Sequence, residues 1–419
     1  MAQRYDTYKD SGVQWLGEIP GHWECVQNRF IFKENVRAPQ PNDIPLSLSQ
    51  VDGLIPTDDM KESSLKTSSY DNWKRVLEED IVLNRFKAHL GVLFASKYVG
   101  MVSFHYGVFE KNRPIVPKYY EYMFHSNQFR LILGFASKGM TVGLQNLGNA
   151  DFYNLKSLFP LLPEQHAIVS YLDDKCGKID EWVAQKRKEL ELLGEMKQRV
   201  TASAVTRGLN PNVTMKQTNI PWLPEVPEHW DCVKLKMFCQ DNKEKNKGNV
   251  ESCVLSLSYG NVIVKKNINF GLVPENYESY QIVNPGYIIL RLTDLQNDHK
   301  SLRTGLVKNR GIITSAYVGL VVKNMNSEYT QLLLHSYDVM KVFYDMGGGL
   351  RQSMSYNDIS NIYIPVPPLS EQRAIVSHIT ERTAKIDKMV ENVNKEIEGI
   401  KEYKQRLISD VVTGQIKVC

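Results

Sequence analysis

The sequence predicts a mixed α+β chain, in which two globular α/β domains form a tandem pseudo-repeat and each domain is followed by a long helix. Nearly the same eleven residues occur twice, as LPEQHAIVSYL at 162–172 and as LSEQRAIVSHI at 369–379. Other matches follow at the same shift of 207 positions. A period this long indicates duplicated domains and not a solenoid. After each copy, apolar residues recur at coiled-coil spacing, which predicts that the two helices pack together.

Residues 1–19 form an N-terminal segment, and residues 208–226 form a linker that leads into the second unit. The motif WLGEIPGHWECV at 15–26 matches WLPEVPEHWDCV at 222–233. The pairs His22–Trp23 and His229–Trp230 are part of this match. We interpret them as a repeated packing joint, with a ligand-binding or catalytic role as the alternative.

The globular domains are predicted at 20–162 and 227–366. Short β-branched runs bounded by Gly, Pro and Asn predict strands in both, including EDIVLNRF at 79–86 and GYIILRL at 286–292. One late helical stretch is expected in each domain, at 117–135 and at 327–346. Outside these features the sequences of the two domains align only over short segments, such as LSLS at 46–49 and 255–258.

The long helices are predicted at 163–207 and, with the C-terminal tail, at 367–419. Neither helix has an interior proline after its opening residues, and both carry an apolar seam in steps of four and three. Lys197 and Lys404 occupy seam positions, where lysine can extend its charge to water or fix the register. The seam residues expected to pack, or to form a subunit interface, are Ile179, Val183, Leu190, Leu193, Val200, Ile386, Val390, Val393, Ile397, Ile400 and Leu407.

Composition places the chain among globular proteins. Its 419 residues are 42% hydrophobic and 23% charged, and the net charge of +4 is only mildly basic. No run approaches the ~20 apolar residues that span a bilayer, and no signal peptide is evident, so we expect a cytoplasmic protein without a membrane contact. The six cysteines form no CxxC pair, which favours free thiols over a metal site.

The sequence carries no motif that predicts catalysis. It contains no GxxxxGK[ST] phosphate loop, GxSxG elbow or HExxH helix. The glycine run GGGL at 347–350 does not continue as GxGxxG. We therefore expect no catalytic residue and no cofactor bound by this chain.

Polar and basic residues cluster near glycine turns in both domains. Arginine suits guanine edges, whereas glutamine and asparagine suit adenine edges. The alternative for each position is a solvated loop. The candidate DNA-binding residues are Arg85, Lys87, Lys138, Gln145, Asn146, Arg291, Arg351, Gln352 and Ser353.

Taken together, the doubled motifs resemble the specificity subunit of type I restriction–modification systems. The matching segments are YKDSGVQWLGEIPGHWECV, its copy IPWLPEVPEHWDCV, the helix openings PLLPEQHAIV and PPLSEQRAIV, and the ending KQRLISDVVTGQIKV. The resemblance covers essentially the whole chain.

This resemblance implies a non-catalytic subunit whose two target recognition domains each read half of a bipartite, asymmetric site in double-stranded DNA. The helices would form the spacer that docks two methyltransferase subunits. S-adenosylmethionine would bind those subunits, while ATP and Mg²⁺ would act on separate restriction subunits.

Two other functions remain open at this point. A coiled-coil scaffold that binds only proteins would show no salt-dependent DNA binding in its complex. A self-contained methyltransferase or nuclease would be active as the purified chain with its cofactor.

Overall fold

The chain divides into two compact units, and each unit contains a domain and parts of both long helices. Unit 1 comprises Met1–Lys186 and Asn394–Cys419, and unit 2 comprises Arg187–Val393. The computed structural model describes residues 3–50, 52–60, 70, 72–139, 145–265, 276–295, 302–344 and 353–418. The predicted domains at 20–162 and 227–366 therefore lie in different units.

The domain of unit 1 is built on two four-stranded sheets. One sheet has the order β4-β11-β8-β9 and is antiparallel, and the other has the order β6-β5-β10-β7 with β5 and β10 parallel. Two further antiparallel pairs, β1-β2 and β3-β12, lie outside these sheets. The strands are β1 (Tyr8–Asp10), β2 (Glu18–Pro20), β3 (Glu24–Gln27), β4 (Phe32–Glu34), β5 (Ile44–Ser49), β6 (Gly53–Pro56), β7 (Lys74–Val76), β8 (Ile81–Asn84), β9 (Leu93–Ala95), β10 (Gly100–Val102), β11 (Tyr106–Lys111) and β12 (Lys156–Phe159).

Helices cover the first of these sheets. They are α1 (Pro117–His125), α2 (Asn127–Ala136) and α3 (Asn149–Asn154), with 3₁₀ turns η1 (Asn28–Phe30), η2 (Thr57–Asp59) and η3 (Arg85–Leu90). Aromatic side chains fill the space between: Phe32 contacts the rings of Tyr120, Phe124 and Phe152. The core then continues into the long helices through Ile168 and Leu172 at one helix start and Val411 and Val412 at the other helix end.

The domain of unit 2 repeats the main features of this plan. An antiparallel sheet has the order β16-β23-β20-β21, and four strand pairs surround it: β13-β14, β15-β24, β17-β18 and β19-β22. The strands are β13 (Met215–Ile220), β14 (Leu223–Pro227), β15 (Asp231–Lys234), β16 (Cys239–Asp241), β17 (Leu255–Ser258), β18 (Asn261–Val264), β19 (Gln281–Val283), β20 (Ile288–Leu290), β21 (Thr304–Leu306), β22 (Gly311–Ile313), β23 (Val318–Val322) and β24 (Tyr363–Val366).

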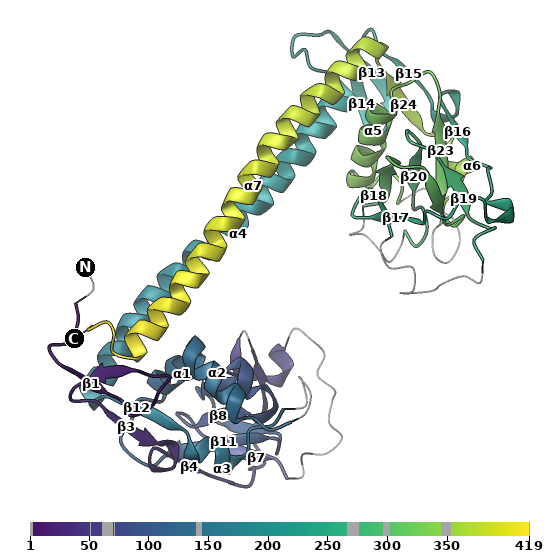
Figure 1. Cartoon of the computed structure of the whole chain (residues 1–419). Coiled ribbons are helices and arrows are strands. Elements are labelled where there is room, and N and C mark those ends of the chain that lie inside the picture. Colours follow the sequence, from purple (N-terminus) through teal and green to yellow (C-terminus); the bar gives the residue numbers. More distant parts are fainter. Residues whose placement is uncertain are drawn as a thin grey trace. The chain divides into compact units, whose positions relative to one another are not determined.

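The helices of this domain are α5 (Ser327–Val339) and α6 (Tyr356–Ile359), with 3₁₀ turns η4 (Leu235–Met237) and η5 (Lys247–Asn249). Figure 1 shows α5 between the sheet and the long helices of this unit. Several elements of the two domains match at the shift of 207: β3 with β15, β4 with β16, and β12 with β24. The duplication is therefore preserved in the pairs β3-β12 and β15-β24 and in the edge strands β4 and β16, although the sequence revealed it there only in fragments.

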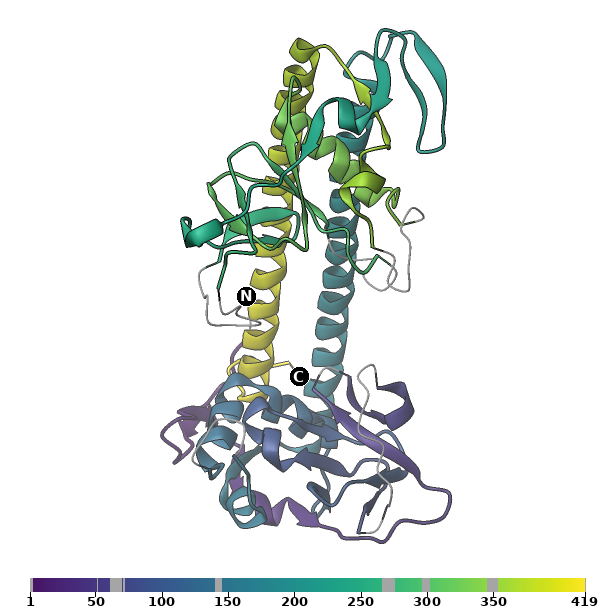
Figure 2. The same cartoon turned by 90° about the vertical axis from the view of Figure 1, so that its right-hand side faces the viewer.

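The long helices are α4 (Leu162–Arg207) and α7 (Leu369–Val412), which pack together. In unit 1, Figure 2 shows that the start of α4 and the end of α7 enter the same domain. Unit 2 has the complementary arrangement, because its core contains Ala204 and Val205 from the end of α4 and Ile375 and Ile379 from the start of α7. The predicted helices at 163–207 and 367–419 agree with these bounds, apart from the tail that follows Val412.

Two predictions of local structure were wrong. The helix expected at 327–346 ends at Val339, and Lys341 beyond it has a left-handed backbone (φ 63°) that cannot continue the helix. The stretch 117–135 was expected as a single helix, but it forms α1 and α2 with a break at Ser126. Ser126 is extended (φ −67°, ψ 149°) and fully buried, and its hydroxyl donates to the Met123 carbonyl at 2.7 Å. A serine whose hydroxyl bonds a carbonyl in the last turn of one helix can begin the next one, and the periodicity of apolar residues does not reveal this break.

Candidate nucleic-acid interface and helix joints

The joint between helix and domain in unit 1 is built around Glu164, in the first turn of α4. One of its carboxylate oxygens accepts a hydrogen bond from the Trp23 indole Nε1 at 3.2 Å and lies 2.9 Å from His22 Nε2. Trp23 is fully buried, and Glu164 is 9% exposed. A carboxylate with so little solvent contact needs partners of this kind. They attach the start of α4 to the turn that precedes β3.

Unit 2 contains the same joint at Glu371, in the first turn of α7. Its carboxylate accepts from Trp230 Nε1 at 3.1 Å and lies 2.9 Å from His229 Nε2. The two histidines thus occupy the packing joint that was predicted for them. The sequence did not identify their glutamate partners, although the repeated Glu-Gln at each helix opening was the available signal.

The glutamine that follows each glutamate completes the joint. The fully buried Gln165 accepts from the Val116 N–H at 2.9 Å and donates to the Pro160 carbonyl at 2.9 Å. Gln372 makes the same two bonds with the Asn326 N–H and the Pro367 carbonyl, both at 2.8 Å. Each amide therefore joins the start of a long helix to the residue that caps α1 or α5.

The far ends of the long helices are held by buried tyrosines. Tyr119 of α1 donates to the Val412 carbonyl at the end of α7 at 3.1 Å. Tyr329 of α5 donates to the Val205 carbonyl near the end of α4 at 3.0 Å. Since the last carbonyls of a helix have no partner within it, these hydroxyls satisfy groups that would otherwise be buried without a bond. Each domain is thus bonded to the start of one long helix and the end of the other.

Ion pairs between the helices occupy corresponding places in the two units. In unit 2, Lys197 Nζ lies 2.6 Å from Asp387 Oδ1. In unit 1, Lys404 Nζ lies 2.6 Å from Asp180 Oδ1. The shift of 207 converts one pair into the other, because KID recurs at 178–180 and 385–387 and KQR at 197–199 and 404–406. The seam lysines extend to carboxylates at the edge of the seam, in agreement with one of the two roles expected for them.

The predicted seam residues face away from solvent. Ile179, Val183, Ile386, Val393, Ile397 and Leu407 are at most 9% exposed. The others are partly buried: Leu190, Leu193, Val200, Val390 and Ile400. The positions on either side of most seam residues are exposed, which is the pattern of two helices packed along one stripe.

Arg85 is engaged inside the domain of unit 1. Its Nη2 lies 2.7 Å from Glu34 Oε1 and 2.7 Å from Asn149 Oδ1. A guanidinium bound in this way braces β4 against the start of α3, so in this structure the Arg85 fork is engaged by protein partners. Lys87, two residues further along η3, is exposed and remains a candidate.

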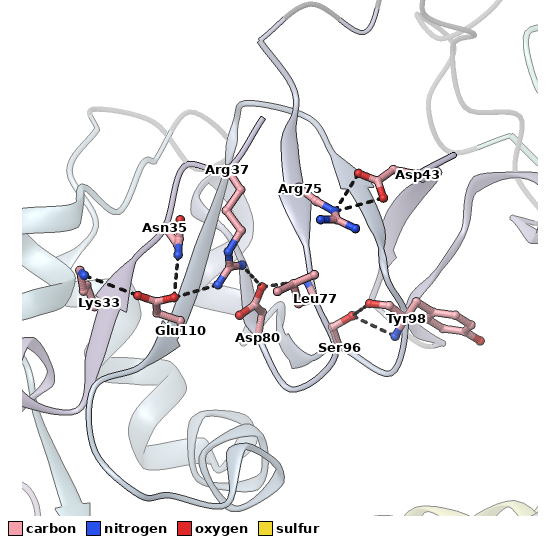
Figure 3. A network of polar contacts seen from close by, with 10 residues as sticks. All are labelled: Lys33, Asn35, Arg37, Asp43, Arg75, Leu77, Asp80, Ser96, Tyr98 and Glu110. Atoms are coloured by element: carbon pink, nitrogen blue, oxygen red, sulfur yellow. Dashed lines mark hydrogen bonds and ion pairs between the residues drawn. The ribbon is translucent and has the colours of Figure 1, made fainter. Parts of the chain in front are cut away.

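Other basic groups in this domain are also neutralised internally (Figure 3). Arg37 lies 2.6 Å from Asp80 Oδ2 and 2.8 Å from Glu110 Oε2, and Arg75 Nε lies 3.1 Å from Asp43 Oδ2. Hydrogen bonding from the Asn35 amide, helped by Arg37, lowers the pKa of Glu110. Positive charge free to meet phosphate must therefore come from other side chains.

Lys138 and Asn146 form one end of the domain's candidate interface. Their backbones exchange two hydrogen bonds, at 3.0 Å from Lys138 N to Asn146 O and 2.9 Å in return. Asn146 is exposed, and the Lys138 side chain is 78% exposed while its ammonium pairs with Asp151 at 2.8 Å. Gln145, which is partly buried, precedes Asn146. The structure thus brings together the three residues that the sequence grouped.

The corresponding place in unit 2 carries Ser353. Met354 N donates to Leu292 O at 2.8 Å, and in unit 1 Leu147 N donates to Arg85 O at 3.0 Å. These two bonds are related by the shift of 207, so Asn146 and Ser353 lie at equivalent positions. Ser353 is exposed and Arg291 partly buried, whereas Arg351 and Gln352 lie outside the described residues.

Arg303 is a fully buried cation that the sequence analysis missed. Its Nη1 donates to the carbonyls of Arg291 at 3.0 Å and Thr293 at 2.8 Å, and its Nε donates to the Tyr344 hydroxyl at 3.1 Å. Its backbone N–H donates to Asp338 Oδ2 at 2.7 Å. The guanidinium therefore shapes the backbone that carries Arg291. Only the arginine in a strand-like run, SLRTGL, could have indicated it.

The described residues supply no reactive centre. They contain no cluster of three His, Cys, Asp or Glu side chains able to hold a metal, and their five cysteines are free. Burial raises the pKa of Cys239 to about 12, so its thiol stays protonated. Among the same residues, no helix combines the length and apolar character needed to cross a bilayer.

Comparison with known proteins shows what the chain is similar to. Residues 227–399 match the family model described as type I restriction modification DNA specificity domain. That match covers the second domain and much of α7, and the chain as a whole is similar to type I restriction–modification specificity subunits. It is 24% identical to the MjaX specificity subunit of Methanocaldococcus jannaschii, over 96% of each chain. It is 27% identical to the MjaVIII type I specificity subunit of the same organism, over 82% of this chain and 80% of the relative.

Solved structures share the fold of this chain. A chain from a structural study of complex assembly and conformational transition of the type I R-M system superposes with a TM-score of 0.69 and 14% identity, over 95% of this chain and 99% of that chain. The HsdS subunit from Thermoanaerobacter tengcongensis superposes with a TM-score of 0.50 and 15% identity, over 94% of this chain and 96% of that chain. The fold predicted from the duplication, two mixed domains with packed long helices, is confirmed.

Proposed function

We propose that the chain is the DNA-recognition subunit of a type I restriction–modification complex and that it reads a bipartite, asymmetric site. The observation that carries this proposal is the pair of identical joints. Glu164 and Glu371 attach two domains to one helical frame in the same way. The outer loops of the domains differ in sequence, so each domain presents its own polar side chains to DNA.

The chain acts in this proposal as a non-catalytic subunit. Two methyltransferase subunits dock on α4 and α7 and supply S-adenosylmethionine. Restriction subunits add the steps that use ATP and Mg²⁺, and the assembly works on the double-stranded DNA of the cytoplasm. The weak net charge of +4 supports a shared interface, because a subunit that held DNA alone would need a stronger basic surface.

Base contacts in the first domain are assigned to Lys138, Gln145 and Asn146, with Lys87 as a candidate for the phosphate backbone. In the second domain they are assigned to Arg291 and Ser353, together with Arg351 and Gln352 of the segment outside the described residues. Asparagine and glutamine amides can pair with adenine, and an arginine fork can pair with guanine.

Methylation mapping tests the proposal directly. Genomic DNA from cells with and without this gene should differ at one split motif, and the assembled complex should bind a duplex carrying it with strong salt dependence. A complex that assembles normally but binds no DNA at any salt concentration would favour the coiled-coil scaffold. Activity of the purified chain with cofactor alone would favour a self-contained enzyme.

A further inference from the structure

A basic pocket lies in unit 2, where the end of α4 meets the linker and the first turns of α7. It has a volume of about 530 Å³, and its cationic or titratable lining residues are Arg199, Arg207, His378 and Arg382. Leu209 and Val213 contribute an apolar part of the wall. A concave site with a few convergent polar groups on an apolar wall is the usual form of a binding site.

The positive charge of this pocket is only partly neutralised. Arg207 pairs with Glu225, and the nearby Glu381 is held by Lys385 at 2.7 Å. Among the described residues, neither Arg199 nor Arg382 makes an ion pair. Both guanidiniums are exposed and so can meet an incoming anion. The end of α4 itself attracts cations, but that attraction is worth little at an exposed surface and leaves their donors free.

The equivalent place in unit 1 has lost this character. The shift of 207 converts Arg199 to Arg406 and Arg382 to Lys175, but it also converts Ser203 to Asp410 and His378 to Tyr171. The Arg406 charge acts on Asp410, and Lys175 lies over the Tyr171 ring at 5.5 Å. Arg207 has no cationic counterpart, because Gly414 stands in its place. A repeated frame thus holds one charge-balanced site and one positive site.

The position of the pocket within unit 2 favours a protein ligand over DNA. Figure 1 places β13 and the start of α7 at one end of this unit, and β17, β18 and β20 toward the other end. Arg291, the described basic candidate for base contact in this unit, directly follows β20. A pocket on the helices, away from the candidate base contacts, lies on the surface assigned to partner subunits.

We propose that the Arg199–Arg382 pocket binds a carboxylate-rich segment of a protein subunit that docks on the helices. The inference rests on the proposed function, because that function supplies the partner. Two guanidinium forks can each take a carboxylate with two hydrogen bonds, and lysine cannot reproduce that geometry. Since unit 1 lacks the positive site, the acidic segment distinguishes one docking surface from the other.

The test uses the full-length chain and compares matched pairs of substitutions. The pocket pair is Arg199→Gln with Arg382→Gln, and the control pair is Lys175→Gln with Arg406→Gln in unit 1. All four side chains lie at the surface or half-buried, so circular dichroism should show unchanged folding. The probes are a fluorescent hexaglutamate peptide, the purified methyltransferase subunit, and a duplex that carries the mapped site.

At low salt, the pocket pair should weaken the binding of hexaglutamate and of the methyltransferase subunit by roughly 5- to 10-fold, the sum of two exposed charge pairs. The control pair should change the binding of hexaglutamate and of the methyltransferase subunit by less than about 2-fold, because an exposed ion pair often contributes little. Arg382→Glu should weaken binding further, and the differences should shrink as salt rises.

The proposed pocket would be contradicted if the pocket pair and the control pair weakened binding equally, or if neither pair weakened it. If the pocket pair lost binding to the duplex but kept binding to the peptide and the methyltransferase, the two arginines would contact DNA phosphates. That result would contradict a protein partner for the pocket. These results are separable from the proposed function, which fails only if the wild-type complex does not bind its own mapped duplex.

Discussion

At the scale of single residues, Glu164 and Glu371 each accept hydrogen bonds from a tryptophan and a histidine at the start of a long helix. These side-chain donors stand in for the water that would otherwise solvate the carboxylate. The indole nitrogens of Trp23 and Trp230 have no other acceptor among the described contacts. A buried donor that loses its acceptor costs about 1–3 kcal/mol. Each glutamate thereby links the start of a helix to the turn before β3 or β15, about 140 positions earlier in the sequence.

Glu164→Ala should lower the free energy of unfolding by about 1–3 kcal/mol, because it leaves the Trp23 N–H and the His22 ring without their partner. Urea denaturation of the variant, together with Trp23→Phe and the double variant, would measure the coupling between the two side chains. Glu371→Ala is the equivalent substitution in unit 2. Additive effects of Glu164→Ala and Trp23→Phe would show that the hydrogen bond contributes nothing.

Two partly buried histidines predict a loss of stability in mild acid. Burial lowers the pKa of His125, and burial with the nearby Lys197 charge lowers the pKa of His335. The unfolded chain therefore binds more protons than the folded chain once the pH falls through the ordinary histidine value of about 6.5. Stability should decrease from pH 7.5 to pH 5.5.

Melting temperatures across this pH range test the effect. The His125→Gln/His335→Gln variant should lose less stability on acidification than the wild type, because neither amide titrates. His105, which lies against Phe86 and Phe104 near the surface, provides the control substitution. The same acid sensitivity in the double variant would place the cause in other groups.

At the scale of elements, the long helices were predictable to within two residues because the seam repeats over many turns. Their openings were visible too, as proline followed by glutamate and glutamine. The break at Ser126 was not, since it depends on a buried hydroxyl that bonds the Met123 carbonyl. Nor could the sequence show that Arg85 is held by Glu34, because that partner lies 51 positions away. Periodicity reports which face is buried, whereas polar partners are set by tertiary contacts.

Ile397→Asp places a carboxylate in the seam of α7, where the isoleucine is 5% exposed. Burial of an unpaired carboxylate should cost several kcal/mol. We expect a lower melting temperature and reduced co-purification of the methyltransferase subunit. Met389→Asp on the same helix is the control, because Met389 is 53% exposed and a surface change of this kind should stay within about 0.5 kcal/mol. Equal melting temperatures of the two variants would contradict the packing of the helices along this seam.

At the scale of the whole molecule, one frame holds two domains of different sequence. The parts that the duplication kept are the joints, the interhelical ion pairs and the strands β3, β4 and β12 with their partners. The parts that differ are the loops that carry the candidate base contacts. Sequence comparison within the chain could identify the frame, because identical packing keeps identical residues. It could not give the bases that are read, since these depend on loop geometry.

This division predicts the result of a domain exchange inside the chain. Residues 20–160 can be replaced by residues 227–367, because both segments carry the His-Trp joint and begin and end beside the same strand pair. Glu164, outside the exchanged segment, would then meet His229 and Trp230 in place of His22 and Trp23. Tyr329 would supply the hydroxyl that Tyr119 now donates to the Val412 carbonyl. The exchanged chain should therefore fold and assemble with the methyltransferase.

Genomic methylation should then show the second half-site retained and the first half-site replaced by a further copy of the second. A change in both half-sites, or a folded and assembled complex that still methylates the original motif, would contradict the assignment of one reader to each domain.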